Sequence, residues 1–155
     1  MVKEEFKGYD AAQIANLFLD IAQSEENNLT NMQLQKLVYI AHGYSLALLD
    51  HPLTFRNIHA WQFGPVIPKL YKALQKYGSG IVRDKLKEES SEPIDDGSKR
   101  LIEEVWKGYG KLSGPKLLTL THKSDTPWSI TWSATPFGII DNGMIKQHYL
   151  EMVSR

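Results

Sequence analysis

The five histidines are the side chains of this sequence best suited to acid–base or metal chemistry, because imidazole changes charge near neutral pH. His42 falls within an apolar, helix-like segment, and His122 precedes Asp125 by three residues. A histidine beside a carboxylate can orient a general base or bind a metal. The chain has neither an H-E-x-x-H motif nor the spacing of a two-histidine, one-carboxylate site. We therefore interpret His42 and His122 as hydrogen-bonded structural residues, and keep a histidine-dependent hydrolase or metalloenzyme as an alternative.

Other kinds of catalytic site lack their sequence motifs. Cysteine is absent, which excludes disulfides, thiolate nucleophiles and cysteine-rich zinc sites. No G-x-S-x-G elbow is present, and the stretch GYGKLSG, residues 108–114, lacks the register of a phosphate-binding P-loop. The adjacent Glu103 and Glu104 are interpreted as part of a solvated helix face. The sequence therefore predicts no catalytic residue, no metal site and no cofactor.

Length and charge limit the possible partners as well. A chain of 155 residues is most simply one domain, and its 18 basic and 18 acidic side chains leave no net charge. Affinity for nucleic acids depends largely on Lys and Arg, so a nucleic-acid partner, and with it a DNA-binding autorepressor, is disfavoured. No apolar run has the length of a signal peptide or of a membrane span. We expect a cytoplasmic protein without a membrane partner.

The elements that would position these residues begin with two capped helices. Asp10 with Gln13, and Thr30 with Gln33, have the capping-box form that starts a helix. The second helix is predicted over the run LQKLVYIAHGYSLALL, residues 34–49, and its periodicity places Leu48 on one apolar face with Leu34, Leu37, Val38, Ala41 and Tyr44. Only two narrow polar stripes interrupt the apolar surface of this helix: Gln35 with His42, and Lys36 with Gly43. A helix that is apolar over most of its circumference is buried on several sides, so we place it at the centre of the fold.

A short hairpin and a third helix are predicted next. Alternating apolar residues indicate strands at 53–55 and 58–63, joined by a turn near Arg56-Asn57, with Gly64-Pro65 ending the second strand. A helix from Pro68 is expected to end at Gly78, a good left-handed terminator. Residues 79–97, rich in charge, Ser, Gly and Pro, are predicted as a surface loop that is flexible over about 83–97.

Three further helices complete the expected fold. They are predicted to start at Ser98, at Ser113 and at about Asn142. Between the last two lies KSDTPWSITWSATPFG, residues 123–138, which is predicted as a loop containing two tryptophans. The sum is a mainly α-helical single domain over residues 1–155, with a core of about 10–152, a central buried helix and one small β-hairpin.

Tryptophans at rigid corners are the strongest indication of a binding surface. Trp61 leads into the Gly64-Pro65 corner, and Trp128 and Trp132 lie in the proline-containing loop. Aromatic side chains on a restricted backbone bring large contact areas at low entropic cost, and Pro65 and Pro68 restrict φ at this corner. Most aromatic residues of the chain are expected in the core, so the alternative is that these three are also core residues.

Three stretches of the chain resemble the Panacea antitoxin domain, a family of phage-associated proteins. They are NMQLQKLVYIAHGYSLAL at 31–48, PLTFRNIHAWQFGPVIPKLYKALQKYG at 52–78 and LTLTHKSDTPW at 118–128. The resemblance covers roughly residues 10–150. Its most specific pieces are Ala60-Trp61 leading to Gly64-Pro65-Val66, Tyr71 with Tyr77-Gly78, and Thr121-His122 with Pro127-Trp128.

The resemblance implies a mostly helical antitoxin that neutralises a bacterial or prophage toxin by direct protein contact, without a cofactor. One branch of the family acts as an adaptor that delivers its toxin to an ATP-dependent protease, and this is kept as a second alternative. The motif positions, besides Leu34 and Gly78, are the expected interaction groove: Gln35, Lys36, Tyr39, His42, Trp61, Gly64, Pro65, Val66, Tyr71, Tyr77, Thr121, His122, Pro127 and Trp128. Because the chain has hardly any extension beyond the domain, neutralisation is expected to come from the domain's own surface.

The motifs together predict one groove. We expect Trp61 to pack against the central helix, and the hairpin corner and the THKSDTPW segment to meet around His42. If Trp61 is buried, its truncation is expected to unfold the protein at a cost of about 3 to 5 kcal/mol. Truncation of an exposed groove residue is expected to weaken toxin binding without changing Tm.

Overall fold

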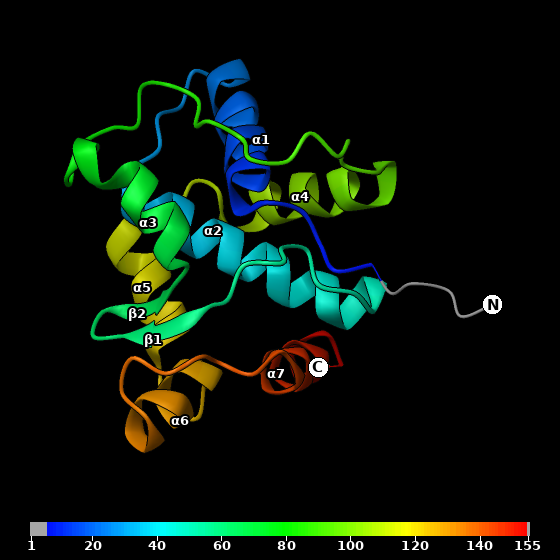
Figure 1. The fold of residues 1–155 in the computed structure, drawn as a ribbon, viewed down its shortest axis with the longest axis vertical. Helices are drawn as coiled ribbons and strands as arrows, with labels where there is room; N and C mark the ends of the chain where they lie inside the picture. The colour runs from blue at the N-terminus through cyan, green and yellow to red at the C-terminus, as the bar shows by residue number, and fades with distance from the viewer. Residues whose placement is uncertain (1–5, 155) are drawn as a thin grey trace.

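Helix α2 (Asn31–Tyr44) lies at the centre of the fold, as its nearly continuous apolar surface predicted (Figure 1). In this computed structural model, which describes residues 6–154, α2 contacts helices α1, α3, α4, α5 and α7 and strand β2. The side chains of its two polar stripes, Gln35 with His42 and Lys36, are buried with the rest. Buried polar groups need hydrogen-bond partners, so these three side chains must find them inside the protein.

Seven α-helices and one two-stranded hairpin make up the regular structure of residues 6–154, which is therefore mainly α-helical. The other helices are α1 (Ala11–Ser24), α3 (Pro68–Leu74), α4 (Asp96–Tyr109), α5 (Gly114–His122), α6 (Pro127–Ala134) and α7 (Asn142–Val153). A π-helical turn, η1 (Ser45–Leu49), follows α2, and a 3-10 turn, η2 (Gln75–Tyr77), follows α3. In the view of Figure 1, α1 lies above α2, and α6 and α7 lie below it. Across 6–154, no helix combines the length and the apolar character that a bilayer span requires.

Side-chain caps start α2, α4, α5 and α7 within two residues of the predicted positions. The Gln33 N–H donates to Thr30 Oγ1 at 3.3 Å, and Gln33 Oε1 accepts from the Thr30 N–H at 2.9 Å. Helix α4 begins at Asp96, before the predicted Ser98, because the Asp95 carboxylate accepts from the Ser98 N–H at 2.8 Å. The polar residues before each apolar run therefore fix the positions of these helices.

The hairpin is displaced from its predicted position. Strands β1 (His59–Trp61) and β2 (Gly64–Val66) are antiparallel, with Trp61 opposite Gly64, so the turn lies at Gln62-Phe63 and the predicted turn at Arg56-Asn57 is wrong. Gly64-Pro65 begins the second strand and does not end one. The φ of Gly64 is +105°, a region that favours glycine, and this lets the chain reverse before β2. Residues 53–55 are not part of this hairpin.

The segment predicted as a loop with two tryptophans contains helix α6, so that prediction is wrong. The Thr126 side chain accepts from the Ser129 N–H at 3.2 Å, and Pro127 occupies the first turn, where a missing N–H costs nothing. Trp128 and Trp132 consequently lie one turn apart, with their rings stacked at 5.9 Å. Thr126 followed by Pro127 is itself a helix-start signal, so a proline in this segment does not by itself indicate a loop.

The end of the central helix also differs from the prediction. After Tyr44 the chain continues as the π-helical turn Ser45–Leu49. A π turn holds more residues than an α turn, so the side chains that follow rotate away from the predicted face. Leu48, placed inward by α-helical periodicity, is 58% exposed, whereas Leu46 is buried.

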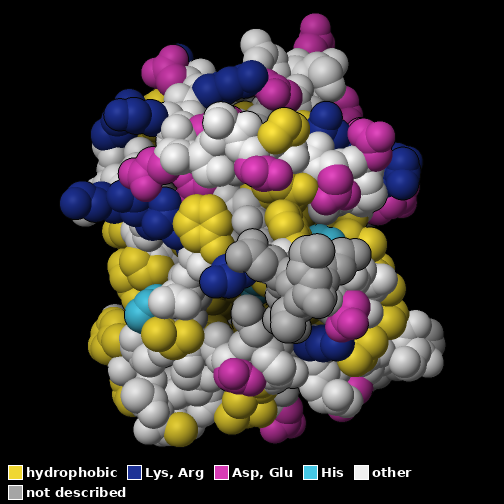
Figure 2. Space-filling view, turned by 45° about the vertical axis from the view of Figure 1, so that its right-hand side comes forward, with side chains coloured by type: hydrophobic (Ala, Val, Ile, Leu, Met, Phe, Trp, Pro, Cys, Tyr) yellow, Lys and Arg dark blue, Asp and Glu magenta, His cyan; other side chains and the backbone are white. Residues whose placement is uncertain are grey.

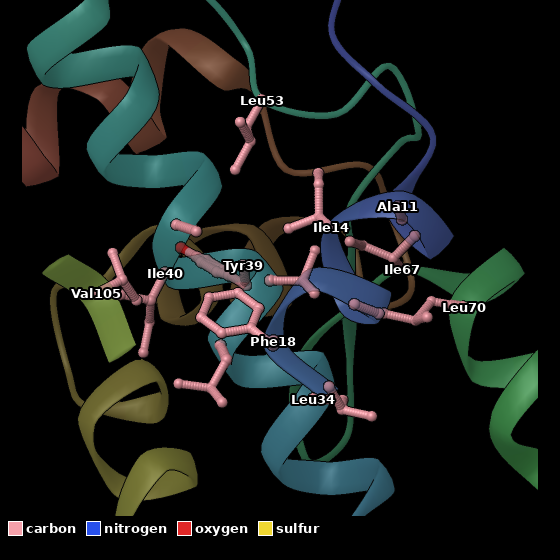
Figure 3. Close-up of a cluster of buried hydrophobic side chains, with 14 of the residues drawn as sticks. Ala11, Ile14, Phe18, Leu34, Tyr39, Ile40, Leu53, Ile67, Leu70 and Val105 are labelled. Carbon is pink, nitrogen blue, oxygen red and sulfur yellow. The ribbon is translucent and has the colours of Figure 1, made fainter. Parts of the chain in front are cut away.

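The core forms where α2 meets its neighbours (Figure 3). Phe18 from α1, Ile40 from α2 and Val105 from α4 converge with Leu70 from α3 and with Leu53. All five side chains are buried, and together they hold α2 in a fixed position relative to the elements around it. A rigid α2 matters for function because its first turns line the candidate site.

The loop between α3 and α4 is attached to α1. Its Val82 and Leu86 are buried, and the Asn16 side chain makes two hydrogen bonds with the backbone of Leu86, at 2.7 and 2.8 Å. The Val82 N–H also donates to the Leu29 carbonyl at 2.8 Å. The segment predicted as a surface loop therefore contributes side chains to the core while forming no α-helix of its own.

Gly43→Ala is expected to destabilise the protein by about 1 to 3 kcal/mol through overpacking. A Cβ at position 43 would lie 2.3 Å from ring carbons of Tyr149, the buried α7 side chain that crosses α2 there. Gly108 on α4 provides the control, because a Cβ there meets nothing within 4 Å. Gly108→Ala is expected to stabilise the helix by about 0.5 to 1 kcal/mol. Urea denaturation measures both variants, and equal effects would contradict the close packing of α7 on α2.

Candidate functional site: an apolar groove over a buried lysine

A mostly apolar groove of about 830 Å³ lies between the first turns of α2, the β1–β2 hairpin, α3 and the start of α5. Its lining includes the side chains of Trp61, Phe63, Val66, Tyr71 and Phe137. A volume of this size holds a drug-sized ligand or several residues of a peptide. The groove is therefore the first candidate for a functional site.

The aromatic lining is partly exposed to solvent. Phe63 is 64% exposed and Phe137 is 59% exposed. Trp61 is half-buried, and its ring meets that of Tyr71 edge to face, with centroids 5.1 Å apart. Large apolar side chains that remain exposed around a groove are typical of binding surfaces. Because Trp61 is only half-buried, the stability cost predicted for its truncation on the assumption of burial is too large.

Lys36 lies at the floor of the groove and is 2% exposed. Its Nζ donates to the carbonyls of Phe63 at 3.1 Å and Pro65 at 2.9 Å, so the central helix holds the turn and the strand β2 that follows it. Burial penalises the charged amine and lowers the pKa of Lys36 to about 7. Lys36 thus holds the hairpin in place, and its amine can gain or lose a proton near neutral pH.

Gly64 leaves the space that the lysine occupies. A Cβ at position 64 would lie 2.8 Å from Lys36 Nζ and 3.1 Å from Leu118 Cδ1. The next residue, Pro65, is buried and supplies one of the two carbonyls that Lys36 bonds. Gly64-Pro65 therefore serves the close approach of the hairpin to the lysine, in addition to the positive φ that the turn requires.

Two more polar side chains at the floor are only partly satisfied. Gln35 Oε1 accepts from the Ile67 N–H at 3.1 Å, but its buried Nε2 has no hydrogen-bond partner in residues 6–154. The buried Oδ1 of Asn31 likewise has none in that part of the chain. Both residues line the groove. An unpaired buried polar atom costs about 1 to 3 kcal/mol of stability. A bound molecule that supplied the missing hydrogen bonds to Gln35 and Asn31 would recover part of this cost.

His42 does not line the groove, and the prediction that the groove forms around it is wrong. Its ring is fully buried. Nδ1 accepts from the N–H groups of Leu53 at 3.2 Å and Thr54 at 3.3 Å, so Nε2 carries the proton and donates to Asn142 Oδ1 at 2.9 Å. With both nitrogens bonded, His42 fixes the 53–54 backbone and the start of α7. Burial lowers its pKa to about 4.

Acidification is expected to destabilise the protein through His42. In the unfolded chain His42 binds a proton near pH 6.5, whereas in the folded protein its ring stays neutral down to about pH 4. Between these pH values the proton binds only the unfolded state and therefore favours unfolding. The loss between pH 6.5 and 4 amounts to about 2 to 3 kcal/mol. His42→Gln is expected to remove this part of the pH dependence, and His59→Gln to keep it. Denaturation at several pH values measures the slopes, and equal slopes in the two variants would contradict this role.

The THKSDTPW segment lies behind the hairpin. His122 is stacked on Trp128, with centroids 3.7 Å apart, and Trp128 Nε1 donates to the Trp61 carbonyl at 2.6 Å. The Thr121 hydroxyl donates within its own helix to the Leu117 carbonyl, at 3.0 Å. The hairpin and this segment therefore meet, as the sequence predicted, but through Trp128 and Trp61. Trp128 supports the hairpin, and His122 packs on Trp128; the residues Thr121, His122, Pro127 and Trp128 are not among those that line the groove.

The remaining predicted residues also divide into those that line the groove and those that hold the fold around it. Val66 and Tyr71 line the groove. Tyr39 is buried against Tyr149, with ring centroids 6.2 Å apart, and burial raises its pKa. Tyr77 lies in the turn η2, where its hydroxyl donates to Asp84 Oδ2 at 3.3 Å. Tyr39 and Tyr77 therefore hold the fold around the groove.

The metal-ligating side chains and the surface charges give little support to a metal site or a nucleic-acid site. Residues 6–154 contain no group of three or more His, Asp or Glu side chains placed to hold a metal ion. On the face shown in Figure 2, acidic and basic side chains are interspersed and not gathered by sign. This pattern agrees with the zero net charge and offers no broad field for phosphates.

Sequence reasoning missed Asn31, Phe63 and Phe137 as groove residues. Asn31 is the first residue after the Thr30 cap, and Phe137 lies far along the chain, in the segment after α6. The signal that was available is the pair Gln62-Phe63, because a phenylalanine in a two-residue hairpin turn projects into solvent.

Comparison with known proteins identifies the family. Residues 34–129 match the family described as Antitoxin SocA-like, Panacea domain. A relative named Antitoxin SocA, from Caulobacter vibrioides (strain NA1000 / CB15N), is 34% identical over 130 residues, which cover 78% of this chain and 69% of the relative. No solved structure matches the chain significantly. The chain therefore belongs to the SocA-like antitoxin family and carries its Panacea domain.

Proposed function

We propose that this protein is a cytoplasmic antitoxin that neutralises a cognate protein toxin by binding it directly in the groove. Membership of the SocA-like family supports the antitoxin role. The observation that carries the direct-contact mechanism is the groove of about 830 Å³, lined by the exposed rings of Phe63 and Phe137. Exposed aromatic side chains beside a recess are the usual anchors of protein interfaces.

The hairpin side of the groove is already ordered before any partner binds. Lys36 bonds carbonyls of the turn and of strand β2, and the Trp128 indole bonds the Trp61 carbonyl at the end of strand β1. A wall fixed in this way loses little conformational entropy on binding, so more of the contact energy becomes affinity. This preorganisation favours a protein that works by shape over one that folds around its partner.

Catalysis is the less favoured role. His42, the best candidate for a general base, is fully buried with both ring nitrogens bonded. His122 is stacked on Trp128 beneath the hairpin. Neither imidazole lines the groove, and among the described lining residues the titratable side chains are Lys36 and Tyr71.

A titration of toxin with this protein tests the proposal. The toxin is taken as the product of the adjacent open reading frame that arrests growth when expressed alone. We expect its activity on its target to fall linearly and reach zero at a fixed molar ratio near one to one, with a stable complex on size-exclusion chromatography. An enzyme would inactivate the toxin at far lower ratios, and an adaptor would lower toxin levels only when the protease is present. Either result would overturn the proposal.

A further inference from the structure

The groove floor presents hydrogen-bond donors that lack acceptors. A lysine ammonium has three N–H donors, and Lys36 uses two of them on the carbonyls of Phe63 and Pro65. Residues 6–154 supply no third acceptor to it. Gln35 Nε2, on the neighbouring residue of α2, adds an amide donor group with no partner in the same part of the chain. The floor therefore favours an occupant that brings acceptor oxygens.

The charges of the groove favour an anionic occupant. Lys36 is the one charged side chain among the residues described as its lining, and no acidic residue is among them. The ion pairs found within residues 6–154 involve other cations, such as Arg56 with Asp10 and Lys146 with Asp50. A carboxylate placed on Lys36 would thus favour the protonated form of this amine, whose pKa is about 7 in the free protein, and would meet no competing anion. The desolvation cost of burying the lysine is already present in the free protein. It is therefore not added on binding, and most of the attraction between carboxylate and lysine contributes to affinity.

We propose that the groove binds an aspartate or glutamate side chain of the toxin, flanked by apolar residues, with its carboxylate on Lys36 Nζ and Gln35 Nε2. This inference rests on the proposed antitoxin function. The apolar neighbours of the acidic residue pack against Trp61, Phe63 and Tyr71, and Asn31 Oδ1 accepts a backbone N–H of the same segment. A groove of about 830 Å³ holds several residues of a peptide, so we take the acidic residue as one inside a chain and not a terminal one.

Selection from a displayed library of random heptapeptides tests the inference without the toxin. Both ends of each heptapeptide are joined to the display scaffold, so that no terminal carboxylate is offered. We expect wild-type protein and Lys99→Met, which removes an exposed lysine of α4, to enrich peptides with Asp or Glu beside apolar residues. Lys36→Met is expected to lose the preference for the acidic residue. Enrichment of peptides without Asp or Glu on wild-type protein would overturn the inference.

Synthetic peptides give a second test that needs no variant of the protein. The best acidic heptapeptide, acetylated and amidated, is compared with its Glu→Gln (or Asp→Asn) form on wild-type protein. We expect at least a tenfold loss of affinity for the amide form, and a shift of the Lys36 side-chain NMR signals with the acidic peptide alone. Equal affinities of the acidic peptide and its Gln or Asn form would overturn the inference. It would also be overturned if the Gln or Asn peptide bound more tightly with a free C-terminal carboxylate than with an amidated C-terminus.

The two proposals fail in different ways. If the peptides show no acidic preference while the toxin is still neutralised at a fixed ratio, the carboxylate site is wrong and the antitoxin function stands. If acidic peptides bind Lys36 but no toxin is bound, the groove is a peptide site of another kind, and the antitoxin function fails.

Discussion

Raising the pH from 7 to 9.5 is expected to stabilise the wild-type protein, and Lys36→Met is expected to abolish this gain. The pKa of Lys36 falls from 10.5 to about 7 on folding because the side chain is buried. In this pH range the unfolded chain still binds the proton while the folded chain has released it, so stability rises with pH. The gain is about 3 kcal/mol between pH 7 and 9.5.

Denaturant unfolding at several pH values measures this effect. The relevant quantity is the slope of the unfolding free energy against pH, because Lys36→Met also leaves the carbonyls of Phe63 and Pro65 without their donor and thereby shifts the absolute stability. The control is Lys99→Met, which removes an exposed lysine and is expected to keep the wild-type slope. The range stops at 9.5 because burial raises the pKa of Tyr39 and Tyr149, which reverses the slope once free tyrosine ionises. A Lys36→Met variant that retains the slope would contradict the burial of the amine.

Trp61→Ala is expected to remove most toxin binding while leaving the protein folded. The ring is half-buried and lines the groove, so its removal is expected to cost about 1 to 2 kcal/mol of stability, less than a core tryptophan. The Trp61 carbonyl, which accepts from Trp128, belongs to the backbone and survives the substitution. An aromatic anchor at the centre of an interface contributes about 2 kcal/mol or more, which corresponds to about a 30-fold loss of affinity.

Calorimetric titration of the toxin, with Tm recorded for each variant, separates the two effects. Phe55→Ala is the control, since Phe55 is 44% exposed and is not among the residues lining the groove. It is expected to bind toxin like the wild type. If Trp61→Ala also binds normally, or if both variants lose affinity equally, the groove is not the contact surface.

Features that depend on neighbouring residues could be predicted from the sequence. Thr30 with Gln33 and Ser113 with Lys116 cap their helices through contacts three residues apart. The position of α2 at the centre also followed from its own composition. In each of these cases the physical cause lies within one turn of the helix, where sequence spacing translates directly into geometry.

Features that depend on contacts between distant segments could not be predicted in this way. The hairpin turn lies at Gln62-Phe63, where Lys36, 27 residues away from Phe63, bonds the carbonyls of Phe63 and Pro65. Similarly, α2 has two polar stripes, and its sequence does not say which part of them borders a recess. The sequence placed the groove around His42, but the hairpin packs over Gln35 and Lys36 in the first turns of α2, whereas His42 is enclosed by residues 53–54 and α7.

A second apolar recess makes a rival contact surface. It has a volume of about 400 Å³ and lies between η1 and α4, where Leu48 and Val105 are part of its lining. Leu48 is 58% exposed. A toxin that bound there would leave the groove free. The two surfaces can therefore be distinguished by which backbone N–H groups the toxin protects from hydrogen exchange.

Hydrogen–deuterium exchange of the protein with and without its toxin tests the central claim most directly. We expect the toxin to slow exchange in the hairpin turn at 61–66 and in the first turn of α5, which border the groove. Exchange at η1 and α4 is expected to stay as in the free protein. Protection confined to η1 and α4, with the hairpin turn unchanged, would show that neutralisation does not occur through the groove.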